Sequence, residues 1–199
     1  LPKGSAHSAP GPGPKRCRRR RGRRLIGLAP VPKIVFDCCV ISNFALSGSL
    51  PMIHGIYRDT SCITDFVSAE ILKGIRAGHG GLAAIPEAVK AGWLLEVSLT
   101  SREEKTLFES LSISLGLGEA SSLAVAARRG FRFASDDQAA RREAGRLDVR
   151  LTGTIGILAK AVRLHLCDVK AADRYLSIMI DHGFYAPVRS IREVLRPRY

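Results

Sequence analysis

Four acidic residues are the part of this sequence whose types and placement could do chemistry. They are Asp37 after the run IVF, Glu70 in FVSAEI, Glu119 in LGLGEASS and Asp137 in FRFASDD. An acid at the carboxyl end of a buried strand, joined by acids from separate elements, is how a fold assembles oxygen ligands for Mg²⁺ or Mn²⁺. The leading hypothesis is therefore metal-dependent hydrolysis of a phosphodiester bond.

Asp37 and Glu70 also have structural alternatives. Asp37 could cap the helix predicted over 41–49, but Ser42 is available for that role, which favours a functional interpretation of Asp37. Glu70 borders the apolar face of its predicted helix. Alternatively it is a surface residue that pairs with Lys73 on the next turn, worth only about 0.2–0.5 kcal/mol.

The remaining acids lie where helices begin. Glu119 opens a predicted helix, and an acid there is favoured by the helix dipole alone. Asp136 and Asp137 together follow the strand-like run FRFAS, and two acids are more than one helix cap requires. We therefore expect Asp137 to be a metal ligand, with Asp136 as a helper or as the cap.

Holding several carboxylates together has a cost that a metal ion removes. Two like charges about 4 Å apart repel by roughly 4 kcal/mol at an effective dielectric constant near 20. Without a metal, one of the groups takes up a proton instead. One ion, or two about 3.5–4 Å apart, would bind the scissile phosphate and activate a water molecule. The five histidines form no spaced cluster, so we expect no histidine base.

The elements that must position these acids alternate between strand-like and helix-like runs. Strands are predicted at 33–37, 61–64, 93–99, 131–135 and 149–151. Helices are predicted at 41–49, 51–57, 65–76, 82–92, from 101 onward, 118–129, 136–145, 154–165 and 168–182, with a last turn at 190–195. This alternation predicts an α/β fold with a mostly parallel sheet flanked by helices, in which sites form beyond the carboxyl ends of strands.

Charge is concentrated at one end of the 199-residue chain. The formal net charge is +13, but residues 1–31 hold nine Lys and Arg residues and no acid, which leaves about +4 for the rest. We expect a disordered Pro-, Gly- and Arg-rich tail over 1–31 and a single domain over 32–199. The run KRCRRRRGRR is either a nucleic-acid-binding arm or a dispensable leader; no aromatic residues interleave its arginines for base stacking.

Cysteine usage and hydropathy predict a cytoplasmic protein. The five cysteines are odd in number and show no CxxC spacing, which favours buried thiols over disulfides or a zinc site. No apolar run of about eighteen residues is present, so we expect no membrane span.

Taken in order, these motifs resemble those of the PIN-domain superfamily, in particular a less-characterised branch related to toxin–antitoxin ribonucleases. The resemblance covers about 33–184 and rests on IVFDCCVISNFA, SAEILKGI, LGLGEASSLAVAARRG, FRFASDDQAARREA and RLTGTIGILAKAVRLHL. It implies a three-layer α/β/α sandwich. It also implies an endoribonuclease that uses Mg²⁺ or Mn²⁺. The catalytic and metal-binding acids would be Asp37, Glu70, Glu119 and Asp137, with Asp136 as a further ligand.

The resemblance also implies supporting residues and partners. Asn43 and Ser135 match frequent polar positions, and Arg141, Arg142 and Lys160 could contact RNA phosphates or be solvated helix charges. The expected partners are RNA, an antitoxin protein and a second copy of the chain. Two features depart from the family pattern: Glu119 stands where Asp is usual, and cysteines follow Asp37. They keep open an alternative, a non-catalytic PIN-like module that binds nucleic acid or protein with a vestigial metal site.

Overall fold

The structure is a computed structural model that describes residue 1 and residues 33–195. The predicted tail therefore lies, apart from its first residue, outside the described residues. Among residues 33–195 no single helix is long and apolar enough to cross a membrane. One bent pair of helices has the length and composition of a membrane span, but on these two criteria alone.

Five short parallel strands form the central sheet. They are β1 (Ile34–Phe36), β2 (Ser61–Thr64), β3 (Leu94–Val97), β4 (Arg132–Ala134) and β5 (Leu151–Thr152), in the spatial order β3-β2-β1-β4-β5. Every pairing is parallel, with Phe36 opposite Ala134 where β1 meets β4. The chain builds one half of the sheet outward from β1 and then returns to add β4 on the other side. The switch point, where ligands bind in such folds, is therefore the gap between β1 and β4.

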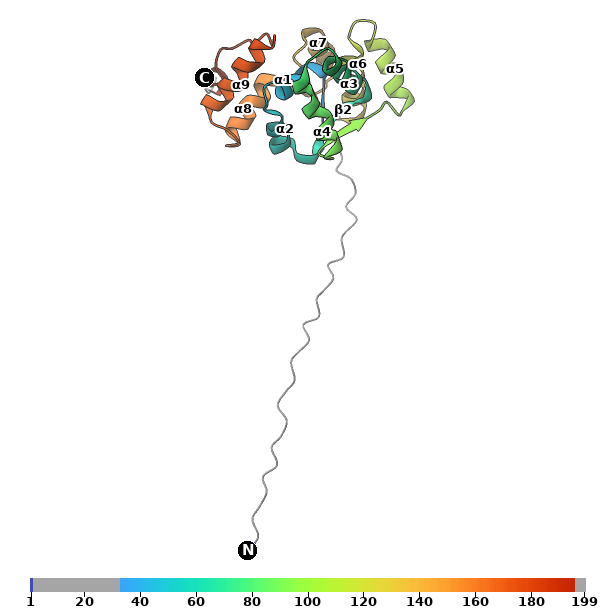
Figure 1. Ribbon diagram of the computed structural model, residues 1–199. Helices are drawn as coiled ribbons and strands as arrows, with labels where there is room; N and C mark the ends of the chain where they lie inside the picture. The colour runs from blue at the N-terminus through green and yellow to red at the C-terminus, as the bar shows by residue number, and fades with distance from the viewer. Residues whose placement is uncertain (2–32, 196–199) are drawn as a thin grey trace.

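Helices cover both faces of this sheet (Figure 1). Their bounds are α1 Cys38–Leu46, α2 Leu50–Tyr57, η1 Arg58–Thr60, α3 Asp65–Arg76, η2 Gly80–Ala83, α4 Ala84–Lys90, α5 Arg102–Leu111, α6 Leu117–Arg129, α7 Gln138–Arg146, α8 Thr154–Arg163, α9 Val169–Asp181 and α10 Arg192–Leu195. One hydrophobic core joins α1–α4, α8 and α9 to the sheet, and the second core joins α5–α7 to it. Successive residues of β1 belong to opposite cores, as alternation along a strand requires. The predicted three-layer α/β/α fold is confirmed.

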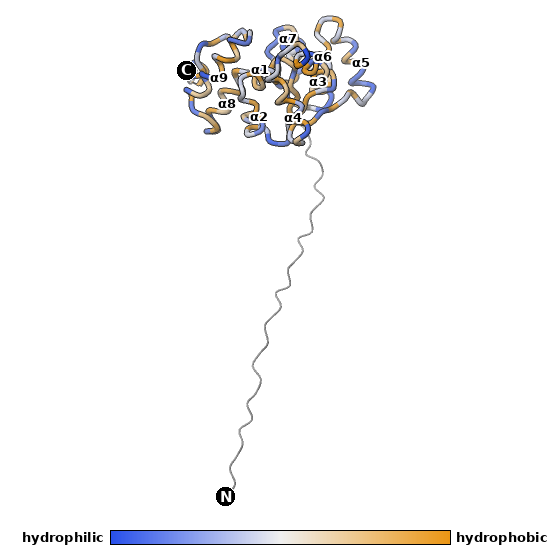
Figure 2. The backbone as a smooth tube through the Cα atoms, viewed as in Figure 1, coloured by the Kyte–Doolittle hydropathy of each residue, from blue (hydrophilic) through white to orange (hydrophobic). Residues whose placement is uncertain are grey.

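Local sequence signals explain where several helices begin and end. Ser101 and Glu104 form the predicted capping box at the start of α5. The Thr64 hydroxyl accepts a hydrogen bond from the Val67 N–H at the start of α3. Gly130 ends α6 with φ of +67°, a left-handed conformation that glycine adopts without strain. In Figure 2 hydrophilic and hydrophobic residues alternate along the helices as well as in the connections between elements.

The first helix differs from its prediction. It begins at Cys38 and not at Ile41, because Asp37 caps it: Asp37 Oδ1 accepts the Val40 N–H at 2.8 Å. The prediction that Ser42 would free Asp37 from capping is wrong. The apolar residues of α1 predict which face is buried, but the capping residue determines where the helix begins.

Candidate functional site

Most of the predicted site residues come together at the carboxyl edge of the sheet, across the switch point. Asp37 follows β1, and Ser135, Asp136 and Asp137 follow β4, its neighbour. The Asp37 N–H donates to the Ala134 carbonyl at 3.0 Å, which ties the two strand ends together. The two neighbouring strands thus place Asp37, Asp136 and Asp137 just beyond their carboxyl ends.

Asp37 is the most unusual acid in the described chain. Its side chain is fully buried, and only Oδ1 has a hydrogen-bond partner, the Val40 N–H. The second oxygen, Oδ2, is buried with no hydrogen-bond partner among the described residues. A buried carboxylate oxygen without a hydrogen-bond partner destabilises the fold by about 1–3 kcal/mol or more. Such an oxygen is therefore a candidate ligand of a bound cation.

The environment of Asp37 favours its protonated form. Its pKa is raised from 3.8 to about 7, chiefly by burial; the Asp136 and Glu119 carboxylates add to the rise, whereas the Ser135 hydroxyl and the Val40 N–H oppose it. A bound cation would reverse this balance by stabilising the carboxylate.

Asp136 and Asp137 have different roles from those expected. Asp137 caps α7, since its Oδ1 accepts the Ala140 N–H at 2.7 Å. Of the two alternatives for Asp136, helper or cap, the cap is therefore wrong and the helper remains. Asp136 instead accepts from Thr154, through the backbone N–H at 3.0 Å and the hydroxyl at 2.5 Å. Burial raises the pKa of Asp136, and the hydrogen bonds from Thr154 oppose that shift.

Gly153 and Thr154 are site residues that the sequence reasoning did not assign. Thr154 is buried, and its hydroxyl also accepts a hydrogen bond from Asn43 Nδ2 at 3.1 Å, so Asn43 supports Asp136 through Thr154. A Cβ at Gly153 would lie 2.4 Å from Asp136 Oδ1, so only glycine leaves room for this carboxylate. The motif TGT contained both residues, but the sequence alone could not show their contact with Asp136.

Glu70 and Glu119 approach the site from α3 and α6. Glu70 Oε1 accepts the Gly118 N–H at 3.0 Å, and a Cβ at Gly118 would come within 2.6 Å of Glu70 Oε2. Glu119 Oε2 accepts the Gly116 N–H at 3.0 Å as part of a capping box. Burial raises the pKa of Glu119, and the Asp137 and Glu70 carboxylates add to the rise. Glu119 thus uses one of its two carboxylate oxygens at the start of α6, as its structural alternative predicted.

The five acids form one electrostatic neighbourhood but no finished metal cage. The Asp136 and Glu119 carboxylates raise the pKa of Asp37, and the Asp137 and Glu70 carboxylates raise the pKa of Glu119. Within residues 33–195, however, no three His, Cys, Asp or Glu side chains are placed closely enough to hold a metal ion as they stand. The chemistry of the donors suits Mg²⁺ or Mn²⁺, because all are carboxylates and one buried oxygen has no partner there.

The three basic residues predicted to contact RNA lie in different settings. Arg141 Nη1 donates to the carbonyls of Ser135 at 2.7 Å and Thr152 at 3.1 Å, so it braces the site. Arg142 is exposed on α7. Lys160 lies away from these acids, with its Nζ 4.3 Å from the centre of the Tyr57 ring.

The cysteines that follow Asp37 are not nucleophiles at neutral pH. Desolvation raises the pKa of the half-buried Cys38 thiol to about 12, and the Glu70 carboxylate adds to the rise. The pKa of Cys39 is also raised, by desolvation and by the Asp37 carboxylate, although part of this residue is open to solvent. All four described cysteines are free; Cys62 is buried as predicted, whereas Cys39 is exposed. Cys17 lies outside the described residues.

An open groove of about 1140 Å³ runs beside the acids. Asp136 and Asp137 line it, together with Asn43, Arg141 and the exposed Tyr185. Asp37, Glu70 and Glu119 are not among its lining residues, and the Asp37 side chain is fully buried. A substrate in this groove would meet the pair after β4 first.

Comparison with known families gives a single assignment. A family model described as a PIN domain matches residues 33–198, which is most of the chain and all of the described fold except residue 1. No curated protein and no solved structure matches the chain. PIN domains are generally nucleases that use divalent metals. With its parallel sheet and the acids at its carboxyl edge, the chain belongs to the PIN-domain family.

Proposed function

We propose that this chain is an endoribonuclease that hydrolyses RNA phosphodiester bonds with one or two Mg²⁺ or Mn²⁺ ions. The observation that carries the proposal is the buried, unpartnered Oδ2 of Asp37 at the switch point of the sheet. The Asp136 and Glu119 carboxylates act on Asp37 electrostatically, and Glu119 is in turn affected by Asp137 and Glu70. A cation would relieve both the missing partner and the mutual repulsion.

The proposed roles follow from what each side chain already contacts. Asp37 and Asp137 would be the principal metal ligands, because each uses only Oδ1 to cap a helix and has its second oxygen outside the cap. Glu70 and Glu119 would complete the ligand set, and Asp136 would act as a further ligand held by Thr154. Asn43 and Ser135 would support these acids. When bound, the metal supplies Lewis acidity and an activated water.

Cleavage of labelled RNA tests this proposal. The purified chain should cut single-stranded or structured RNA in Mn²⁺, and EDTA should stop the reaction. Asp37→Asn should lower the rate by about two orders of magnitude or more, because it removes charge from the metal-binding oxygen pair. Asp181→Asn, at an exposed acid of α9, is the matched control and should cleave normally. Robust cleavage by Asp37→Asn would contradict the assignment.

We extend the proposal to a toxin of a toxin–antitoxin pair, with an antitoxin protein as partner. The groove beside Asp136 and Asp137 supports this, because it is open, partly apolar and close to the acids. A peptide with basic side chains would complement it. A gene for a small protein beside the gene for this chain would identify the partner. A homodimer through α8 also remains proposed, and its test is the molecular mass in solution.

A second candidate function is a non-catalytic module that binds RNA or protein. The observation that favours it is that no three metal-ligating side chains are gathered within residues 33–195. One carboxylate oxygen of Glu119 also accepts the Gly116 N–H in the capping box. Calorimetry separates the two: absence of Mn²⁺ binding, together with RNA binding, would favour the module over the nuclease.

A further inference from the structure

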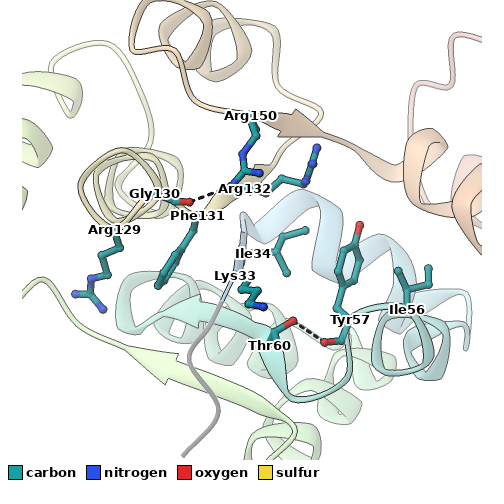
Figure 3. A pocket seen from close by; sticks show the side chains of 10 residues that line it. All are labelled: Lys33, Ile34, Ile56, Tyr57, Thr60, Arg129, Gly130, Phe131, Arg132 and Arg150. Atoms are coloured by element: carbon teal, nitrogen blue, oxygen red, sulfur yellow. Dashed lines mark hydrogen bonds between the residues drawn. The ribbon is translucent and has the colours of Figure 1, made fainter.

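A second hollow lies at the opposite, amino edge of the sheet, and its charge is positive. Its volume is about 580 Å³. Figure 3 shows its lining, which comes from the starts of β1 and β4 and from the residues just before β2 and β5. Lys33, Arg129, Arg132 and Arg150 supply four cationic side chains, and no acid lines it.

Three of these cations are free to meet an anion. Arg129 is already neutralised, since its Nε lies 2.6 Å from Glu104 Oε1. Lys33, Arg132 and Arg150 make no ion pair with any residue in the described part of the chain. Arg132 and Arg150 are held in place by main-chain carbonyls, with Arg132 Nη1 donating to Leu151 and Arg150 Nη2 donating to Gly130. These bonds position the guanidinium groups without cancelling their charge.

Lys160 adds a fourth free cation beside the hollow. Its ammonium lies over the ring of Tyr57, and Tyr57 lines the hollow. Burial lowers the pKa of Lys160, and the nearby Arg132 charge lowers it further. Cations that repel one another, with no acid between them, are stabilised when a polyanion binds.

The sequence carries further positive charge before Lys33. Lys33 lines the hollow, and the run KRCRRRRGRR, outside the described residues, precedes it in the chain. Arg and Lys clusters with donors held by the backbone are the usual contacts to phosphate groups.

We propose that the amino edge of the sheet, formed by Lys33, Arg132, Arg150 and Lys160, is a second RNA-binding site that holds the sugar–phosphate backbone. It rests on the proposed function only in taking RNA as the polyanion. It lies at the other edge of the sheet from the carboxylates, so it would hold RNA outside the cleavage site. Its contacts are to phosphates, so binding there should be independent of sequence.

RNA binding in EDTA tests this site without any cleavage. Fluorescence anisotropy of a labelled single-stranded RNA would be measured across a range of salt concentrations. Arg132→Gln/Arg150→Gln should weaken binding by about tenfold and reduce the slope of log affinity against log salt by about 1.4, from about 0.7 per lost contact. Lys170→Gln/Arg174→Gln removes two exposed charges from α9 and is the matched control; it should leave the slope unchanged.

A second variant covers the risk that Arg132 and Arg150 are needed for folding. Lys33→Gln/Lys160→Gln removes side chains that donate no hydrogen bond among the described residues and should give the same loss. An unchanged slope in either folded variant, or equal losses in the control, would overturn the site. Cleavage is scored separately: wild-type chain that binds RNA through this edge but never cuts it would refute the nuclease and leave this site standing.

Discussion

Two buried carboxylates at helix starts, Glu104 and Asp37, have pKa values that folding shifts in opposite directions. Glu104 lies in the first turn of α5, is only 3% exposed, and accepts hydrogen bonds from Arg129 and the backbone of Thr100 and Ser101. Its hydrogen bonds to Arg129 are the largest reason its pKa falls from 4.5 to about 2. Asp37 is the N-cap of α1, has one oxygen without a partner among the described residues, and has its pKa raised to about 7.

This difference supports the proposal that Asp37 is held for a ligand, whereas Glu104 stabilises the fold. Both residues cap helices, so position alone does not distinguish them. The deciding feature is the counter-charge: Arg129 lies beside Glu104, whereas carboxylates surround Asp37. Glu104 stabilises the fold as an anion, and Asp37 stabilises it only when protonated or bound to a cation.

The largest expected change in stability comes from breaking the satisfied pair. Glu104→Gln leaves the Arg129 guanidinium without its partner and should lower the free energy of unfolding by about 3 kcal/mol at pH 7. Because the pKa of Glu104 is lowered by folding, its contribution is complete above pH 4.5 and is lost as the pH falls toward 2. Urea denaturation of wild type, Glu104→Gln and the exposed α5 control Glu109→Gln checks this. Equal stability of Glu104→Gln and wild type would remove the contrast.

A smaller change of opposite sign is expected at Asp37. In EDTA at pH 7.5, Asp37→Asn should raise the free energy of unfolding by about 1–2 kcal/mol, because it removes a buried charge while its new amide remains imperfectly paired. The pKa of Asp37 is raised by folding, so its stabilisation is complete below about pH 4 and is lost as the pH rises through 7. The gain should therefore vanish at pH 4. Loss of stability in the variant at pH 7.5 would show that the charged form of Asp37 supports the fold.

The fold was largely predictable, because it depends on local patterns. The strand at Ser61–Thr64, the capping box at Ser101 and the helix end at Gly130 are written in consecutive residues. The start of α1 was missed because apolar periodicity marks a buried face and gives no information on the first turn. Before α7, the two adjacent acids left open which of them caps the helix, and the structure assigns the cap to Asp137.

The candidate acids of the site could be named from the sequence, but the residues that contact them could not. Glu70 and Gly118 lie 48 positions apart, and Asp136 and Thr154 lie 18 apart. Only the packing of α3 on α6, and of α8 beside the β4 end, brings these pairs together. The absence of any partner for Asp37 Oδ2 is likewise a property of three-dimensional packing, which no motif records. The cationic amino edge also depends on assembly, since its residues come from separate strand starts.

Calorimetric titration with Mn²⁺ tests the central claim, that Asp37 is held ready for a cation. At pH 6.5 the wild-type chain should bind Mn²⁺ and release protons, seen as a heat that depends on the buffer, because the metal must displace the proton from Asp37. Asp37→Asn should lose about tenfold or more in affinity together with that proton release. Wild-type binding without proton release, or equal binding by the variant, would contradict the account.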